Sequence, residues 1–393
     1  MDIQLANRVQ RIKPSPTLAV TARAAEMRAA GHDIIGLGAG EPDFDTPEHI
    51  KAAAIKAIEN GQTKYTPVDG TPALKKAIQA KLKRDNGLDY EANEILVSSG
   101  AKQCLVNLLA AVLNEGDEVI IPAPYWVSYP DMTLLNDGTP VVIQAGQEQR
   151  FKITPEQLEA AITDKTRVVF LNSPSNPTGS AYTKAELAAL GEVLLKYPQI
   201  LVASDDIYEH ILWTEEPFAN IAMACPQLKD RTVVVNGVSK AYSMTGWRIG
   251  YAAGPQRVIA AMKKIQSQTT SNPCSISQAA SVAALDGDQS VMGPMLKAFK
   301  ERHDFVVNAL NDMQGVDCVT ADGTFYCFPN VAGAIKALGL KDDVAFSEHM
   351  INEAGVALVP GSAFGLEGHA RISYATSMEN LQKAMERMKK VLG

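Results

Sequence analysis

The chain lacks the features that mark several classes of protein. Its 393 residues include only five cysteines, widely spaced and without a CxxC pair, so neither a disulfide framework nor a metal site is indicated. No apolar run approaches the roughly 18 residues that a membrane helix requires. The first residues, MDIQLANRVQRIKPSP, have no apolar core of the kind that a secretory signal carries. We therefore expect a cytoplasmic protein that binds neither a membrane nor a metal.

An excess of positive charge is also missing. The net charge is -7, which gives no electrostatic footprint for nucleic acid. A chain that is 46% hydrophobic and 21% charged is ordinary for a soluble globular enzyme. Its length allows two domains, or one large domain with a smaller satellite.

One stretch of the chain is without acidic residues. Between Arg231 and Leu285 there is no Asp or Glu, and Lys240 lies within this stretch, shortly after an apolar β-branched run. A lysine without a nearby carboxylate, at the end of a buried strand, loses its proton more readily, and its neutral amine can attack a carbonyl. The alternative is that Lys240 and Arg248 are solvated loop charges, and this stretch alone leaves both interpretations open.

Apolar segments alternate with helical patterns from Thr46 onward. Thr46 is predicted to cap a helix with Pro47 in its first position, and a capping box of Thr183 and Glu186 begins another helix. Buried strands are predicted at 95–98, 118–121, 168–171, 200–204, 232–235 and 249–252. This pattern indicates an α/β fold whose large domain has a mostly parallel sheet covered by helices on both faces. Such a sheet binds its ligands at the carboxyl ends of its strands.

The predicted strand ends carry the groups that a phosphorylated pyridine aldehyde needs. A glycine turn that opens a helix suits a phosphate, an aromatic side chain can stack on a ring, and a carboxylate beside a phenol suits the ring nitrogen and hydroxyl. In chain order these groups are Gly100–Lys102, Trp126, the loop amide Asn176, and Asp205 with Tyr208. Each is individually explained as a turn, core or cap residue. Their coincidence at one sheet edge favours a cofactor site.

The glycine-rich stretch GLGAG at 36–40 looks like a dinucleotide-binding turn. However, EPDFDTP follows it, and its two prolines exclude the helix that would hold a pyrophosphate. We interpret the stretch as a turn that brings backbone close to a ligand, with a purely structural turn as the alternative.

Four motifs, SPSNPTG, SDDIYEH, SKAYSMTGWRIGYAAGP and RISYA, resemble those of the class I aminotransferases of the pyridoxal phosphate fold type I superfamily. AGEPDFDTP, TKYTP and PYWVSYP extend the resemblance, which covers about residues 13–390. Within that family the motifs are most similar to those of bacterial aspartate aminotransferases, some relatives of which also transaminate prephenate. The resemblance implies pyridoxal 5′-phosphate as cofactor and a homodimer with shared active sites.

The resemblance also implies roles for individual residues. Lys240 would bond to the cofactor, Asp205 would pair with the pyridine nitrogen, and Tyr208 and Asn176 would contact the ring oxygen. The remaining implied contacts are stacking by Trp126, a phosphate cradle of Gly100, Ala101, Lys102 and Arg248, a phosphate contact from Tyr65 of the neighbouring subunit, and binding of the substrate α-carboxylate by Arg371 beside Gly40. Many relatives have a phosphate-binding serine where this chain has Gly237. Either Asn236 or Ser239 would replace it.

The pattern changes from about residue 290. Helices are predicted at 303–313, 344–353 and 378–392, strands at 318–319, 324–329, 356–360 and 371–374, and a long connecting helix at about 288–310. We interpret this part as a smaller α+β domain, completed by the N-terminal arm, that brings Arg371 over the cofactor. The predicted division is an arm with part of the small domain (1–45), a large cofactor-binding domain (46–290) and a small C-terminal domain (291–393).

The expected function is transfer of the amino group of aspartate, or glutamate, to a 2-oxo acid such as 2-oxoglutarate. The first alternative is the same scaffold acting on prephenate or aromatic substrates. A lyase that uses the same cofactor is a further alternative. So is a non-catalytic regulator, which is disfavoured because we expect no DNA-binding segment before residue 13 and none after the small domain.

The preference for a dicarboxylate requires a cation near the distal carboxylate, because an unpaired charge in a closed site is costly. Many aspartate aminotransferases use an arginine of the neighbouring subunit, but the region that the resemblance aligns with it, 267–277, contains no arginine. Lys102 is our preferred candidate, and Lys13 in the N-terminal arm is the second, as an aid to larger dicarboxylates. Both are alternatively explained as ordinary polar surface residues.

Replacement of the proposed nucleophile tests the central assignment. Lys240→Ala is expected to fold and to retain cofactor non-covalently, but to lose nearly all turnover because no amine remains to attack the aldehyde. Borohydride reduction followed by mass spectrometry checks the covalent link. A variant that remains both active and reducibly linked to the cofactor would show that another amine is used.

Overall fold

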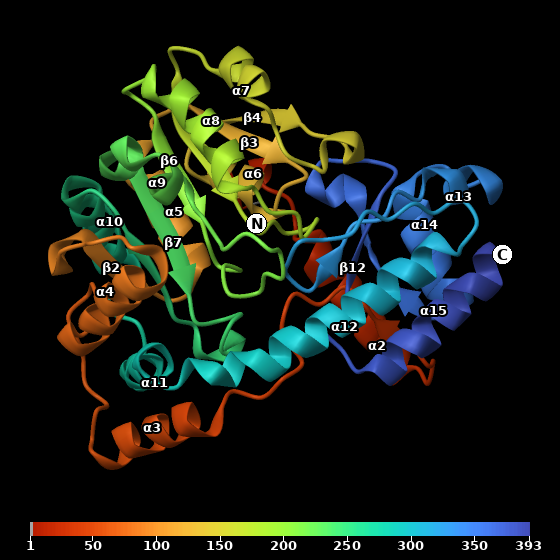
Figure 1. Cartoon of the computed structure of the whole chain (residues 1–393), viewed down its shortest axis with the longest axis horizontal. Coiled ribbons are helices and arrows are strands. Elements are labelled where there is room, and N and C mark those ends of the chain that lie inside the picture. Colours follow the sequence, from red (N-terminus) through yellow and green to blue (C-terminus); the bar gives the residue numbers. More distant parts are fainter. Residues whose placement is uncertain (1–2) are drawn as a thin grey trace.

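A seven-stranded sheet forms the centre of the larger part of the molecule (Figure 1). The structure is a computed structural model that describes residues 3–393. The strand order is β2-β8-β7-β6-β5-β3-β4, and all neighbouring pairs are parallel except the two that β8 forms, with β2 and with β7. The strands are β2 (Ile95–Ser98), β3 (Glu118–Ala123), β4 (Thr139–Gln144), β5 (Thr166–Asn172), β6 (Leu201–Asp205), β7 (Thr232–Gly237) and β8 (Gly250–Ala253). The predicted α/β fold with a mostly parallel sheet is confirmed.

Both faces of this sheet are covered, which explains why its strands are apolar throughout. Val233 and Val235 of β7 pack into a core with α5 (Ala101–Val112), α6 (Ser128–Leu135) and α10 (Gln256–Thr269). Val234 points to the opposite face. The helices of that face are α3 (Glu48–Glu59), α4 (Pro72–Asn86), α7 (Pro155–Ala161), α8 (Lys184–Leu195), α9 (Ile221–Ala224) and α11 (Ser275–Asp286).

A second core joins the two ends of the chain. The long helix α12 (Met292–Asn311) runs from the sheet to this core, and the N-terminal α2 (Pro16–Ala29) lies there beside the C-terminal elements (Figure 1). Ile35 pairs in parallel with Val356, so residues far apart in the sequence share one small sheet. The other elements are α1 (Asn7–Arg11), β1 (Ile35–Gly36), β9 (Tyr326–Cys327), α13 (Ala332–Ala337), α14 (Asp343–His349), β10 (Val356–Ala357), β11 (Val359–Pro360), β12 (Ala370–Ser373) and α15 (Met378–Leu392).

Several local predictions are wrong, each for a tertiary reason. Thr46 does not cap α3: its hydroxyl donates to the Ser243 carbonyl (2.7 Å) and accepts from the Trp247 indole (3.0 Å). The predicted strand at 318–319 is absent, and only the neighbouring Asp317 forms an isolated bridge. The predicted strand at 356–360 is two strands, which belong to different sheets. β4, at the edge of the large sheet, was not predicted.

The helices were also compared with the length and hydropathy of membrane-spanning helices. Within residues 3–393 no helix combines the length and the apolar character that crossing a membrane would require.

Candidate active site

A cavity of about 450 Å³ opens at the carboxyl edge of the large sheet, where the sequence predicts a ligand site. Its volume lies within the range of small-molecule sites. The loops after β5, β6 and β7 meet there with the N-terminal end of α5, and β12 approaches from the second core. Of the predicted site residues, those that line it are Gly40, Ala101, Lys102, Trp126, Asn176, Asp205, Tyr208, Ser239, Lys240, Arg248 and Arg371.

Lys240 follows β7 and points into this cavity. Its Nζ donates to the Gly40 carbonyl at 2.5 Å. Burial lowers the pKa of Lys240 to about 8, and the positive charges of Arg371 and Arg248 contribute to the lowering. A substantial fraction of the amine is therefore neutral near physiological pH, as a nucleophile or a general base requires.

Asp205 ends β6 and is 4% exposed. Burial raises its pKa to about 6, opposed by a hydrogen bond that the Tyr129 hydroxyl donates to Oδ2 at 2.6 Å. Oδ1 accepts only a long bond from the Ile207 N–H, 3.4 Å. The carboxylate is thus mostly ionised at neutral pH and has an oxygen available for a cationic N–H donor. Tyr129 was not identified from the sequence, although it lies in the motif PYWVSYP.

Arg371 is a buried cation that has no acidic partner among residues 3–393. Its side chain is among the largest fully buried ones, and its guanidinium donates only to neutral acceptors, Gly38 O at 2.7 Å and Asn176 Oδ1 at 3.0 Å. Its Nε has no hydrogen-bond partner in the described part of the chain. The guanidinium carbon lies 4.4 Å from the centre of the Tyr326 ring. A buried ion in this state favours binding of an anion in the adjoining cavity.

The turn before α5 has the form of an anion cradle. Gly100 has φ +93°, and a side chain there would collide with the Arg248 guanidinium, whose Nη2 is 2.3 Å from the position of a Cβ. The free N–H groups of the first turn of α5 and the Arg248 guanidinium therefore lie together.

Gly237, where many relatives have serine, has no room for a side chain. A Cβ there would lie 2.8 Å from the Ile249 carbonyl. Asn236 cannot replace that serine, because its amide is bonded to Glu209 and to the Gly237 N–H. Ser239 lines the cavity and is the remaining candidate.

Two tyrosines and an amide form the wall between Lys240 and Arg371. The hydroxyls of Tyr208 and Tyr326 are 3.0 Å apart. Asn176 accepts from Arg371 through Oδ1, and no described residue accepts from its Nδ2. Tyr326 was missed because the run TFYCFP carries no positional signal of a site.

Lys102 lies at the edge of the same cavity. Its Nζ is 4.9 Å from the centre of the Trp126 ring, and partial desolvation, with the charge of Arg248, lowers the pKa of the ammonium. The charged residues that line the cavity are the cations Lys102, Lys240, Arg248 and Arg371 and the anions Glu41 and Asp205. This excess of cations suits a ligand set with several negative charges.

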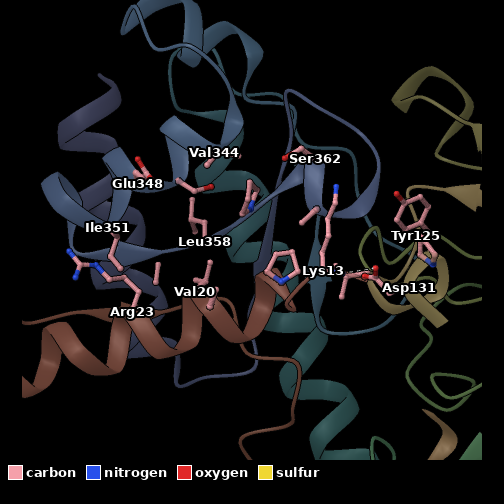
Figure 2. A pocket seen from close by; sticks show the side chains of 18 of the residues that line it. Lys13, Val20, Arg23, Tyr125, Asp131, Val344, Glu348, Ile351, Leu358 and Ser362 are labelled. Carbon is pink, nitrogen blue, oxygen red and sulfur yellow. Dashed lines mark hydrogen bonds between the residues drawn. The ribbon is translucent and has the colours of Figure 1, made fainter. Parts of the chain in front are cut away.

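Three predicted residues do not line this cavity: Gly100, Tyr65 and Lys13. Gly100 directly precedes the lining residue Ala101. Tyr65 is 93% exposed on the molecular surface. Lys13 lies in a second cavity of about 660 Å³, between α2, α6 and α14, where its backbone N–H donates to Asp131 at 3.1 Å (Figure 2). The roles of Tyr65 and Lys13 stay predictions.

Comparison with known proteins identifies relatives along the whole chain. The sequence model of the family "Aminotransferase class I and II" matches residues 32–388. The aspartate/prephenate aminotransferase of Nitrosomonas europaea is 59% identical over 396 residues, which cover 99% of this chain and all of that protein. Among solved structures, the aspartate aminotransferase of Rhizobium meliloti superimposes with a TM-score of 0.96 at 51% identity, covering 100% of this chain and 99% of that one. That of Thermus thermophilus, solved with maleate, has a TM-score of 0.94 at 42% identity, with both chains fully covered.

The lowered pKa of Lys240 gives a direct test on cofactor-free protein. Only a neutral amine attacks the ring of trinitrobenzenesulfonate and displaces sulfite, so modification of Lys240 should rise with pH through a midpoint at about 8, whereas exposed lysines ordinarily titrate at about 10.4. Peptide mass spectrometry reads out the site, with the 90% exposed Lys341 as internal control. A midpoint of about 10 for Lys240 would contradict the buried geometry.

Proposed function

The chain belongs to the class I and II aminotransferase family, and from this premise we propose that it transfers the amino group of aspartate or glutamate to a 2-oxo acid such as 2-oxoglutarate, with pyridoxal 5′-phosphate as cofactor. The observation that carries the proposal is Arg371, a buried guanidinium without an acidic partner in the cavity that also holds the Lys240 amine. An α-amino acid presents the two groups that this pair requires, a carboxylate and an amino group on one carbon.

The residues present fit the proposed cofactor. Its phosphate matches the cradle of Gly100, Ala101, Ser239 and Arg248, and its pyridine nitrogen matches the free oxygen of Asp205. When bound, pyridoxal phosphate supplies an aldehyde that carries the amino group between two substrates and a pyridine ring that withdraws electrons from the substrate Cα. Trp126 contributes an aromatic face, and Tyr208 and Asn176 contribute donors for the ring oxygen.

Three residues of the chain have separate roles in the proposed reaction. Arg371 binds the α-carboxylate through two N–H groups and so orients the Cα–H bond toward Lys240. The Lys240 amine, which is neutral in part because its pKa is about 8, would accept the proton of the substrate Cα, and the resulting ammonium would be the acid that gives this proton up again. Asp205 would hold a proton on the pyridine nitrogen, because its buried carboxylate is mostly ionised at neutral pH and its Oδ1 can accept from a cationic N–H.

Selection of a dicarboxylate rests on Lys102 in this proposal. Its ammonium is one of the four cations of the cavity, and after the α-carboxylate and the phosphate are assigned, it remains for the distal carboxylate. The relatives named for aspartate, and the relative solved with the dicarboxylate maleate, support a dicarboxylate as the substrate. Prephenate is the second candidate substrate, since a relative of 59% identity is named for both.

The assembly and location form part of the same proposal. We infer a homodimer in which Tyr65 reaches the phosphate of the neighbouring subunit, because Tyr65 is exposed close to Ile55 and Ile58, two exposed apolar residues of α3. A cytoplasmic location fits five cysteines that are all free. We also propose domain boundaries at residues 45/46 and 290/291, which would assign Lys240 and Arg371 to different domains.

Exchange of the carboxylate-binding arginine tests the role of Arg371. Arg371→Lys cannot form the two-pronged contact, so kcat/KM should fall by about one to two decades, or about 1.5 to 3 kcal/mol, for every amino-acid substrate alike. The exposed Arg257→Lys serves as the control. If kcat/KM falls for only one substrate, Arg371 contacts the side chain of that substrate and not the α-carboxylate.

A panel of amino donors assayed with 2-oxoglutarate tests the substrate assignment. Lys102→Ala should lower kcat/KM for aspartate and glutamate by about one to two decades while an aromatic or aliphatic donor is nearly unaffected, because only the acidic donors lose a charge-assisted contact. Lys184→Ala, at the start of α8, is the matched control. An equal loss of kcat/KM for acidic and neutral donors would mean that Lys102 contacts the cofactor phosphate or stabilises the fold.

A further inference from the structure

Two loops of the active site are attached to one buried carboxylate behind it. Asp205 ends β6 and the loop after it carries Tyr208, while the loop after β7 carries Lys240. Glu209, which is 5% exposed, belongs to the loop after β6 and accepts a hydrogen bond from Asn236 Nδ2 at 2.8 Å. Asn236 is the second-last residue of β7, which leads into the loop of Lys240. Asn236 Oδ1 in turn accepts from the Gly237 N–H at 2.7 Å. The backbone that leads to Lys240 is thus bonded through one side chain to the loop after Asp205.

A lysine of α4 holds this carboxylate in its charged form. The Lys81 side chain is 1% exposed and its ammonium pairs with Glu209 Oε1. Asn86 completes the contact, accepting from Lys81 at 2.8 Å and donating to Glu209 Oε2 at 2.8 Å. Burial acts to raise the pKa of Glu209, but the charges of Lys81 and His210 outweigh it and hold the pKa below its usual value. The pair therefore consists of two buried ions.

This cluster lies outside the catalytic cavity. Neither Lys81, Glu209 nor Asn236 lines it, so none of them can touch a ligand there. Asp85, Glu209 and His210 approach one another closely enough for a metal ion, but the Lys81 ammonium already supplies the positive charge among them. A buried ion pair is often no more stabilising than apolar residues of the same volume. Stability alone is thus a weak explanation for this one.

We infer that Glu209, held by Lys81, is a positioning residue that sets the Lys240 amine relative to Asp205 and Tyr208. The inference rests on the proposed roles of those three residues. A rigid link between neighbouring loops is needed because a displacement of about 1 Å between reacting groups can reduce a rate about 100-fold. Arg371 is bonded to Gly38 and Asn176 and takes no part in this cluster. Binding of the α-carboxylate should therefore be independent of it.

The test separates positioning from folding. Glu209→Gln leaves Lys81 as an unpaired buried charge and is expected to destabilise the protein. The double variant Lys81→Met/Glu209→Met removes both charges and also the oxygen that accepts from Asn236 Nδ2, and because the buried pair is replaced by apolar side chains it should still fold, which urea denaturation checks. The matched control is Lys152→Met/Glu186→Gln, which removes a partly buried ion pair elsewhere in the sheet domain.

Three measurements on the double variant decide the question. In cofactor-free protein, the pH midpoint for modification of Lys240 by trinitrobenzenesulfonate should move by at least half a pH unit. In the holoenzyme, kcat should fall by about 10- to 100-fold, while the Kd of succinate, an unreactive dicarboxylate, stays within twofold. The control variant should leave all three unchanged.

The possible failures are distinguishable. A folded double variant that keeps the Lys240 midpoint and kcat would show that Glu209 is only structural and would overturn the inference. A parallel loss of succinate affinity would also overturn it, because the effect would then be general to the site. Absence of transamination in the wild type would instead refute the proposed function, and the midpoint in cofactor-free protein would still report on Glu209.

Discussion

The site depends on a buried positive charge that no carboxylate of the described chain balances. Arg371 is 2% exposed and donates only to a backbone carbonyl and an amide. Removing an ion from water costs on the order of several kcal/mol unless a counter-charge compensates. The folded protein therefore retains a position for an anion. The charge of Arg371 is not neutralised from the stretch 231–285, which contributes Lys240, because this stretch contains no acidic residue.

The sheet brings the remaining groups to this position. β5, β6 and β7 are neighbouring parallel strands, so their carboxyl ends and the loops that follow, with Asn176, Asp205 and Lys240, meet at one edge. β8 runs in the opposite direction, so its beginning reaches the same edge and Arg248 precedes it there. The close approach of β8 to the turn before α5 requires glycine: a Cβ on Gly250 would lie 2.1 Å from the Ala101 nitrogen.

Predictions from the sequence succeeded where the signal was local. The strand at 95–98 and the helix at 378–392 have the bounds expected from apolar periodicity. Predictions from local sequence were wrong where a distant residue competed for the same atom. The Thr46 hydroxyl, which was expected to cap a helix, instead forms hydrogen bonds with Ser243 and Trp247. Tyr129 and Tyr326 were missed for a related reason: their contacts with Asp205 and Tyr208 span more than 70 residues.

The sequence by itself determined the α/β class, the set of polar groups at the strand ends and the family resemblance, because these depend on residue type and short-range spacing. Only the tertiary structure decided that Asn236 donates a hydrogen bond to Glu209 and that Ser239 lines the cavity. It also decided that Lys102 and Lys13 lie in different cavities. Such outcomes depend on which of several polar partners lies within about 3 Å. That distance is set by the packing of elements far apart in the chain.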